Sequence, residues 1–237
     1  MKRIIAVMLA CTLCSTIAFG MTGCNNNDTE PGYVIEASEP DIENEDFGFF
    51  IINDKELMII SYNGNSKDIV IPETYKNYTI TTIGESVFNS SDITSVEIPD
   101  TVTDIQDYAF FGSSKLKNVK MSKNLKRFGT NVFNLCTSLE SIELPATIED
   151  MGMYTFSASG LKSVTIPESK TLTKIDHFVF YQCQNLTDIT LPSTITFMED
   201  DVFESCPNKI TINGPDGSYA ETYSKRNNLE FKALKAD

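Results

Sequence analysis

Residues 105–121 read IQDYAFFGSSKLKNVKM, and residues 128–144 read FGTNVFNLCTSLESIEL. Both segments have a leading apolar residue, a Phe five positions later, and a Ser or Cys three positions after that Phe. A repeat this short cannot bury its apolar face alone and must stack on its neighbours, so the pattern predicts a solenoid. The unit occurs six times, with spacings of 22, 23, 23, 24 and 23 residues between Phe88, Phe110, Phe133, Phe156, Phe180 and Phe203.

Each repeat also contains the pattern of a short strand. Apolar residues alternate with polar ones, as at Val119 and Met121 or at Ile142 and Leu144, which indicates a strand with one buried face. We expect these strands to form a parallel sheet on one face, with turns or short helices carrying each Phe on the other. Two extra residues between Pro167 and Leu172 predict a local bulge. Proline, which cannot donate to a strand ladder, closes four of the strands, at Pro99, Pro145, Pro167 and Pro192.

The repeat pattern resembles the BspA-type leucine-rich repeat. Its Gly after the leading residue is present as Gly84, Gly129 and Gly152, and is replaced by Gln106, Asp176 and Glu199. The resemblance implies a right-handed β/α repeat solenoid with parallel strands on the concave face and short turns or helices on the convex face. It covers the chain in three parts: an N-terminal cap with an irregular first rung over 47–82, six repeats over 83–213, and a C-terminal cap over 214–237.

Both caps have their own sequence signatures. Residues 49–60 predict a strand pair at the N-terminal end, and residues 69–72 an irregular first rung. At the other end, residues 214–217 predict a turn. Ser218 and Glu221 then have the spacing of a capping box, which predicts a helix to about Asn227 followed by a strand over 229–234.

The N-terminus has the pattern of a secretory signal. Two basic residues precede an apolar run over 4–19 that is too short to span a membrane. Met21, Thr22, Gly23 and Cys24 resemble a bacterial lipobox, which implies removal of residues 1–23 and acylation of Cys24. The alternative is an ordinary signal peptide in which Cys24 has no role. Residues 24–46 are acidic and predict a disordered tether that holds the folded part away from a membrane.

Charge narrows the class of partner. The whole chain has a formal net charge of −14, and without residues 1–23 it has 17 basic against 33 acidic residues, or −16. Nucleic acids and anionic membrane surfaces are therefore poor partners, and a partner recognised through charge is expected to be basic.

Three cysteines remain after Cys24, and they occupy one position of the repeat: Cys136, Cys183 and Cys206. Rungs about 4.8 Å apart place Cys136 too far from Cys183 for a disulfide, whereas Cys183 and Cys206 are in adjacent rungs and just within reach. Other repeats have Ser here, so we favour packing of a small side chain over a disulfide.

Two surface patches are candidates for binding. The outward strand positions on the concave face are Glu97, Lys120, Glu143, Thr165 and Thr190, with Thr211 expected to continue them. The alternative is that their alternating charges only stabilise neighbouring strands. An aromatic patch of Tyr108, Phe111, Tyr154, Phe178 and Tyr181 would form an adhesive stripe if exposed, or would pack between rungs.

Nothing in the sequence indicates an enzyme, a cofactor or a metal site. His177 is the only histidine and occupies a variable position, where we expect a solvent-facing turn residue instead of a general base. The three cysteines lack the short ligand spacing of zinc sites, and no Gly-rich phosphate loop is present.

The resemblance implies a bacterial cell-surface interaction protein, and for some relatives adhesion. We therefore expect a monomeric, lipid-anchored extracytoplasmic protein that presents its repeats to protein or glycan partners on host or neighbouring cells. One alternative is a structural envelope protein that binds its own cell wall or a membrane partner. A substrate-capturing lipoprotein is a third, disfavoured because an open solenoid lacks a closed pocket.

Overall fold

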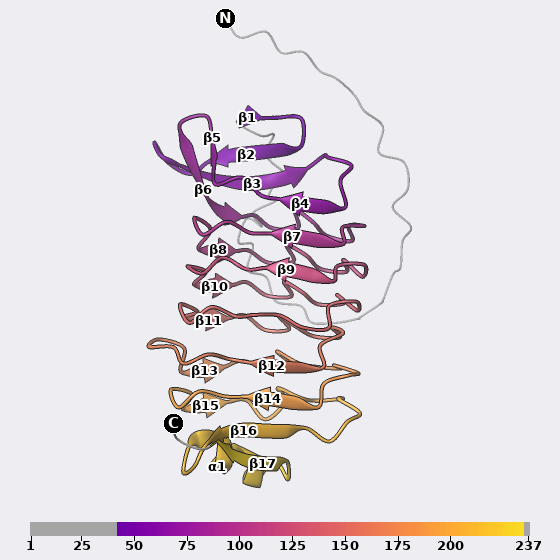
Figure 1. The fold of residues 1–237 in the computed structure, drawn as a ribbon, viewed down its shortest axis with the longest axis vertical. Helices are drawn as coiled ribbons and strands as arrows, with labels where there is room; N and C mark the ends of the chain where they lie inside the picture. The colour runs from indigo at the N-terminus through magenta and orange to yellow at the C-terminus, as the bar shows by residue number, and fades with distance from the viewer. Residues whose placement is uncertain (1–41, 235–237) are drawn as a thin grey trace, which may run out of the picture. The chain divides into compact units, whose positions relative to one another are not determined.

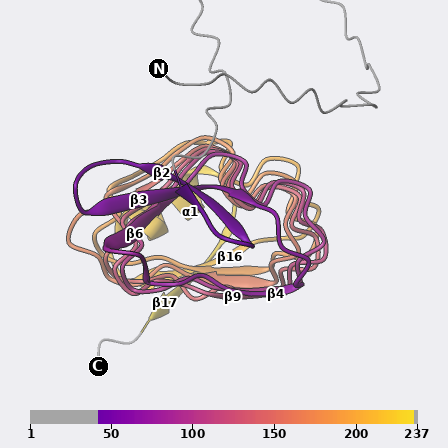
Figure 2. The same cartoon turned by 90° about the horizontal axis from the view of Figure 1, so that it is seen from above.

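The repeats form stacked rungs in the computed structural model, which describes residues 42–234. Short strands lie in two columns along the stack (Figure 1). Seen along the stack, the rungs superpose closely (Figure 2). The signal segment, Cys24 and the tether as far as residue 41 lie outside the described residues.

The first column contains the strands that the alternating pattern predicts. They pair in parallel, as at Val96, Val119 and their neighbours, so the predicted parallel sheet is confirmed. The strands are β4 (Asp68–Val70), β7 (Ser95–Glu97), β9 (Asn118–Lys120), β12 (Ser163–Thr165), β14 (Asp188–Thr190), β16 (Thr211–Pro215) and β17 (Glu230–Leu234).

The second column is formed by the leading apolar residue of each repeat and the residue before it. Two residues are too few to show an alternating pattern, and for this reason the sequence did not predict these strands. They also pair in parallel, for example Ile105 with Phe128. The strands are β6 (Tyr78–Ile83), β8 (Asp104–Ile105), β10 (Arg127–Phe128), β11 (Asp150–Met151), β13 (Lys174–Ile175) and β15 (Phe197–Met198).

The N-terminal cap is a small antiparallel sheet. β2 (Phe47–Ile51) and β3 (Glu56–Tyr62) form the predicted strand pair, and β3 joins β6 in parallel. β5 (Thr74–Tyr75) forms a hairpin with β6. Ordered structure begins before the predicted boundary at residue 47, because β1 (Ile42–Glu43) already pairs with β2.

Both columns are interrupted near the middle of the stack. Ile142 and Leu144 are buried as predicted but form no strand, and β11 does not pair with β13. One residue fewer separates Ser159 from Leu161 than separates Cys136 from Leu139, and the two extra residues predicted to bulge follow Pro167. Because of these length changes, the strand positions of successive rungs do not lie opposite each other here.

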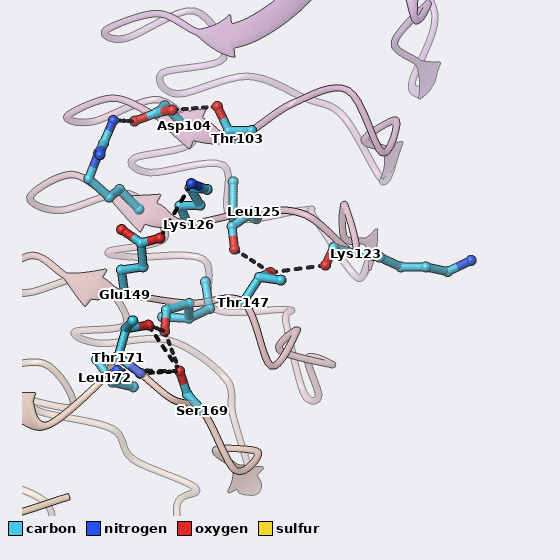
Figure 3. Close-up of polar contacts among 12 residues, drawn as sticks. Thr103, Asp104, Lys123, Leu125, Lys126, Thr147, Glu149, Ser169, Thr171 and Leu172 are labelled. Carbon is cyan, nitrogen blue, oxygen red and sulfur yellow. Dashed lines mark hydrogen bonds and ion pairs between the residues drawn. The ribbon is translucent and has the colours of Figure 1, made fainter. Parts of the chain in front are cut away.

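Hydroxyl groups still tie the rungs together at the interruption (Figure 3). The Thr147 hydroxyl donates to the Leu125 carbonyl at 2.7 Å, and the Ser169 hydroxyl donates to the Ile148 carbonyl at 2.8 Å. The extra residues are therefore accommodated as a local irregularity within one continuous stack.

The six repeat phenylalanines form one column of stacked rings. Successive ring centroids are 5.0–5.8 Å apart, with interplanar angles of 2–11°. The Phe110 N–H donates to the Val132 carbonyl at 3.0 Å, and equivalent bonds join the other rungs. Tyr62 of β3 covers one end of the column at 5.4 Å, and Tyr223 covers the other at 6.4 Å. The segments carrying the six phenylalanines are turns, not helices.

The Ser or Cys of each repeat is selected by a hydrogen bond to the backbone as well as by the small size of its side chain. The Cys136 thiol donates to the Phe110 carbonyl at 3.2 Å, and the Cys183 thiol to the Phe156 carbonyl at 3.1 Å. The Ser113 hydroxyl makes the same bond to Phe88 at 2.6 Å. All three described cysteines are free thiols, which confirms packing in preference to a disulfide.

This burial predicts selective thiol reactivity. Burial raises the pKa of Cys136 to about 12 and that of Cys183 to about 11, whereas Cys206 is only partly buried. Since the thiolate is the reactive form, a short pulse of iodoacetamide should label Cys206 well before the other two in the native protein. Site-specific mass spectrometry checks this, with urea-unfolded protein as the control in which all three react. Equal labelling of native Cys136 and Cys206 would contradict the structure.

The C-terminal cap is the helix α1 (Tyr219–Arg226) followed by β17, as predicted. The predicted capping box does not form, although Glu221 still caps the chain just before the helix. Glu221 accepts from the Gly217 N–H at 2.9 Å, but the Ser218 hydroxyl makes no capping bond. The Ser218 hydroxyl is instead buried without a hydrogen-bond partner, and the Ser218 carbonyl accepts from the Thr222 N–H at 3.3 Å.

Candidate functional site

The predicted face of outward strand residues is present but discontinuous. Glu97 and Lys120 lie opposite each other on β7 and β9 and form an ion pair. Thr165 lies opposite Thr190 on β12 and β14. Between these pairs Glu143 is exposed on a segment that forms no strand.

The end of this face also differs from the prediction. Thr190 lies opposite Asn213, and Thr211 instead lies opposite Asp188. Thr211 therefore does not continue the line of outward residues, because it precedes the buried Ile212 as Asp188 precedes Ile189.

Most charges on the strand face are paired with the neighbouring rung. Besides Glu97 with Lys120, Lys162 contacts Glu140 at 2.5 Å and Lys115 contacts Asp92 at 2.8 Å. Exposed pairs of this kind stabilise a fold only weakly, because water and salt screen their attraction. These ion pairs support the alternative in which alternating charges stabilise neighbouring strands, and a binding site on this face stays a prediction.

The predicted aromatic patch divides into two clusters. Tyr108 packs edge-on against Phe111, with centroids 5.6 Å apart. Tyr154 stacks on Phe178 at 4.8 Å, and Tyr181 packs edge-on against Phe178 at 5.5 Å. The rung between the clusters carries Asn131 and Asn134, which hydrogen bond to each other at 2.6 Å. The rings pack against one another, so one continuous adhesive stripe does not form.

Three residues of the aromatic patch share an unusual backbone conformation. Tyr108, Tyr154 and Phe178 have φ of +57°, +58° and +59°, the left-handed region that bulky residues rarely adopt. Ser86 and Asn131 have the same conformation in their own repeats. The conformation follows from the turn and not from the aromatic side chain: the N–H of Tyr108 and that of Phe110 donate to the following rung, while the Ala109 N–H donates back to the Gln106 carbonyl.

A groove lined by carboxylates runs along the second strand column. It has a volume of about 720 Å³ and is formed by residues of four successive rungs. Thr82, Asp104, Arg127 and Asp150 lie in register along its floor. Arg127 is its only cation and forms an ion pair with Asp104. The other acidic residues lining the groove are Glu56, Glu85, Asp107 and Asp150.

Several of these carboxylates lack a cationic partner. Among residues 42–234, Glu85, Asp107 and Asp150 form no ion pair. The groove therefore has a net negative charge, in contrast to the paired charges of the strand face. Sequence reasoning missed it because it treated the residue before each leading position as a loop residue. The acidic residues at these positions were the sequence feature that could have revealed the groove.

A cluster around His177 was also missed. Asp176, His177 and Glu199 bring one potential ligand atom each to within 4.8 Å of one another. His177 is half-buried, and its Nδ1 lies 2.8 Å from Asp201 Oδ2. That hydrogen bond, followed by the charges of Asp201, Glu199 and Asp176, raises the pKa of His177. His177 is thus held between two rungs, where we expected a free turn residue.

The repeats identify the family. The profile of the BspA-type leucine-rich repeat region matches residues 81–211 and 169–225, with six copies. The chain belongs to this family. Proteins of the family are typically extracellular or on the cell surface, and they generally bind or scaffold other molecules without catalysing reactions. This protein is accordingly a leucine-rich repeat protein of the interaction type.

Solved structures agree on the fold. A leucine-rich repeat protein of T. pallidum is 18% identical with a TM-score of 0.60, over 82% of this chain and 99% of that chain. A leucine-rich repeat protein from Bacteroides ovatus is 22% identical with a TM-score of 0.60, over 75% of this chain and 56% of that chain. No curated protein matches the sequence. None of the helices within 42–234 has the length and apolarity needed to cross a membrane.

Proposed function

We propose that this BspA-type repeat protein is a lipid-anchored adhesin that binds a basic segment of a protein on a host or neighbouring cell. Acylation of Cys24 would anchor it, and the acidic residues after Cys24 would hold the repeats away from the membrane. The observation that carries the proposal is the groove along β8, β10 and β11, in which Glu85, Asp107 and Asp150 have no cationic partner within 42–234.

Charge complementarity favours a basic partner. Unpaired carboxylates close together raise one another's energy, and a partner's Lys or Arg side chains remove that repulsion on binding. The groove extends across successive rungs, so an extended segment with several cations fits it better than a small anion or a nucleic acid. The strand face is the second candidate, but its Glu97 and Lys120 already satisfy each other.

The test is binding of the purified protein to host matrix proteins, glycans and isolated bacterial wall at low and physiological salt. We expect saturable binding to a basic host protein that weakens several-fold as salt rises. Asp150→Asn should weaken it further, whereas Glu143→Gln, which removes one charge from the strand face seven residues away, should not. Equal effects of the two substitutions would reject the groove as the site.

Two other outcomes separate the alternatives. Binding to the isolated wall alone would reject adhesion and favour a structural envelope protein. Thermal stabilisation by a small molecule without binding to any surface would favour substrate capture. Labelling of the intact cells with a radioactive fatty acid, compared between the parent and Cys24→Ser, tests the anchor.

A further inference from the structure

We propose that Asp176, His177 and Glu199 bind a divalent transition-metal ion, with Zn²⁺ the best match, and that Asp201 orients the histidine. The site joins two consecutive rungs at the carboxyl ends of β13 and β15. Lys174 and Ile175 of β13 lie opposite Phe197 and Met198 of β15, so residue 176 faces residue 199 directly across the ladder.

Both carboxylates occupy the position where other repeats have glycine. Asp176 and Glu199 replace Gly129 and Gly152 of earlier repeats, and they do so in consecutive rungs. A Cβ at Gly152 would lie 2.6 Å from the Gly129 backbone, so these earlier rungs approach too closely at this position for any residue but glycine. Two adjacent replacements therefore place two carboxylates next to each other.

The geometry is close to that of a bound metal. The ligand atoms lie within 4.8 Å of one another, and His177 Nε2 is 3.5 Å from Glu199 Oε1. Tetrahedral Zn²⁺ with bonds of about 2.0–2.2 Å holds its ligand atoms roughly 3.4 Å apart. Side-chain movements on the order of 1 Å close the site, and all three residues are partly exposed.

Asp201 supplies the supporting contact that such sites need. A carboxylate oxygen accepts hydrogen bonds, so the 2.8 Å contact with Asp201 Oδ2 places a hydrogen on Nδ1 of His177. In the neutral ring this leaves the lone pair on Nε2, the nitrogen that faces Glu199. Metal-binding histidines characteristically donate their other N–H to a carboxylate in this way. An imidazole with carboxylates favours Zn²⁺ over Mg²⁺ or Ca²⁺, which prefer oxygen ligands.

Lys174 is the competing cation. Its Nζ lies 3.4 Å from Asp176 Oδ1 and 3.3 Å from Glu199 Oε1, so it neutralises the same two carboxylates. The Lys174 side chain is 48% exposed and can swing into solvent when a metal ion enters. Because Lys174 competes with the metal ion, removing the charge of Lys174 is expected to make metal binding tighter.

The experiment is calorimetric titration of the purified protein with Zn²⁺ at neutral pH. We expect one binding event that weakens at least tenfold in His177→Gln and by about 10–100-fold in Asp201→Asn. Lys174→Met should bind more tightly than the parent, whereas Lys209→Met, which removes a lysine paired with Glu230 elsewhere, should not. His177 is the only histidine, so its ring NMR signals report directly whether Zn²⁺ contacts it.

A second readout is the melting temperature, which should rise with Zn²⁺ in the parent and not in His177→Gln. Zn²⁺ affinity that is the same in the parent, His177→Gln and Lys174→Met would overturn the proposal and show only general attraction to an acidic surface. An imidazole signal that is unmoved by saturating Zn²⁺ would overturn it too.

Discussion

Phe156→Ala is expected to lower the free energy of unfolding by about 3–5 kcal/mol, the usual cost of removing a fully buried aromatic ring. Phe156 is 0% exposed and stacks between Phe133 and Phe180, at 5.6 and 5.7 Å. Phe128 packs edge-on against it at 5.8 Å. The substitution therefore leaves a cavity in the middle of the ring column, where no side chain can collapse from the surface to fill it.

The position of Phe156 adds a second consequence. It lies beside the interruption at which neither strand column is continuous, so side-chain packing and the backbone hydrogen bonds of the Phe turns, such as that from the Phe156 N–H to the Val179 carbonyl, join the two halves there. In a stacked array, stability is close to a sum of neighbouring interfaces. Weakening this interface should separate unfolding into two transitions.

Urea unfolding followed by circular dichroism measures both effects. A single transition at lower urea with an unchanged slope would show lost stability without uncoupling, and a shallower or biphasic curve would show uncoupling. Phe197→Ala is the matched control, since Phe197 is 42% exposed and should change stability by less than about 1 kcal/mol. Equal losses for Phe156→Ala and Phe197→Ala would contradict the buried column.

The fold was predictable because each repeat makes the same few contacts. The leading residue, Phe and the Ser or Cys recur at fixed spacing, and most of them are buried against their counterparts in the next rung. The second strand column was not predictable, because strands such as β8 and β10 are only two residues long. The interrupted rung was also missed, since Ile142 and Leu144 keep the apolar pattern without forming the ladder.

The sequence predicted candidate site residues but not the contacts between rungs. Alternating charge correctly suggested the Glu97 and Lys120 pair, because these residues occupy the same repeat position. The aromatic residues of the patch also occupy matching repeat positions. Asn131 occupies the same position in the rung between them, and it divides the patch into two clusters. In the sequence, Asp176 and Glu199 are only departures from a glycine pattern. The structure adds that His177 and Asp201 lie beside them.

The last large effect concerns the end of the ring column. Tyr223→Ala is expected to destabilise the C-terminal cap by about 3 kcal/mol. Tyr223 is 1% exposed, packs on Phe203 with centroids 6.4 Å apart, and donates its hydroxyl to the Glu199 carbonyl at 3.1 Å. Burial raises the pKa of its phenol, as expected for a hydroxyl held away from water.

The consequence differs from that of Phe156→Ala because Tyr223 has a neighbouring rung on one side only. Losing its ring should loosen α1 and β17 while the remaining rungs stay folded, and the edge of β16 would then be free to pair with another molecule. Hydrogen exchange should accelerate in α1 and β17 alone, and light scattering should show association that increases with protein concentration. Tyr223→Phe keeps the ring and loses only the hydroxyl bond, so it should cost about 1 kcal/mol and cause no association. If the two variants behave alike, the cap is held by the hydrogen bond and not by closure of the ring column.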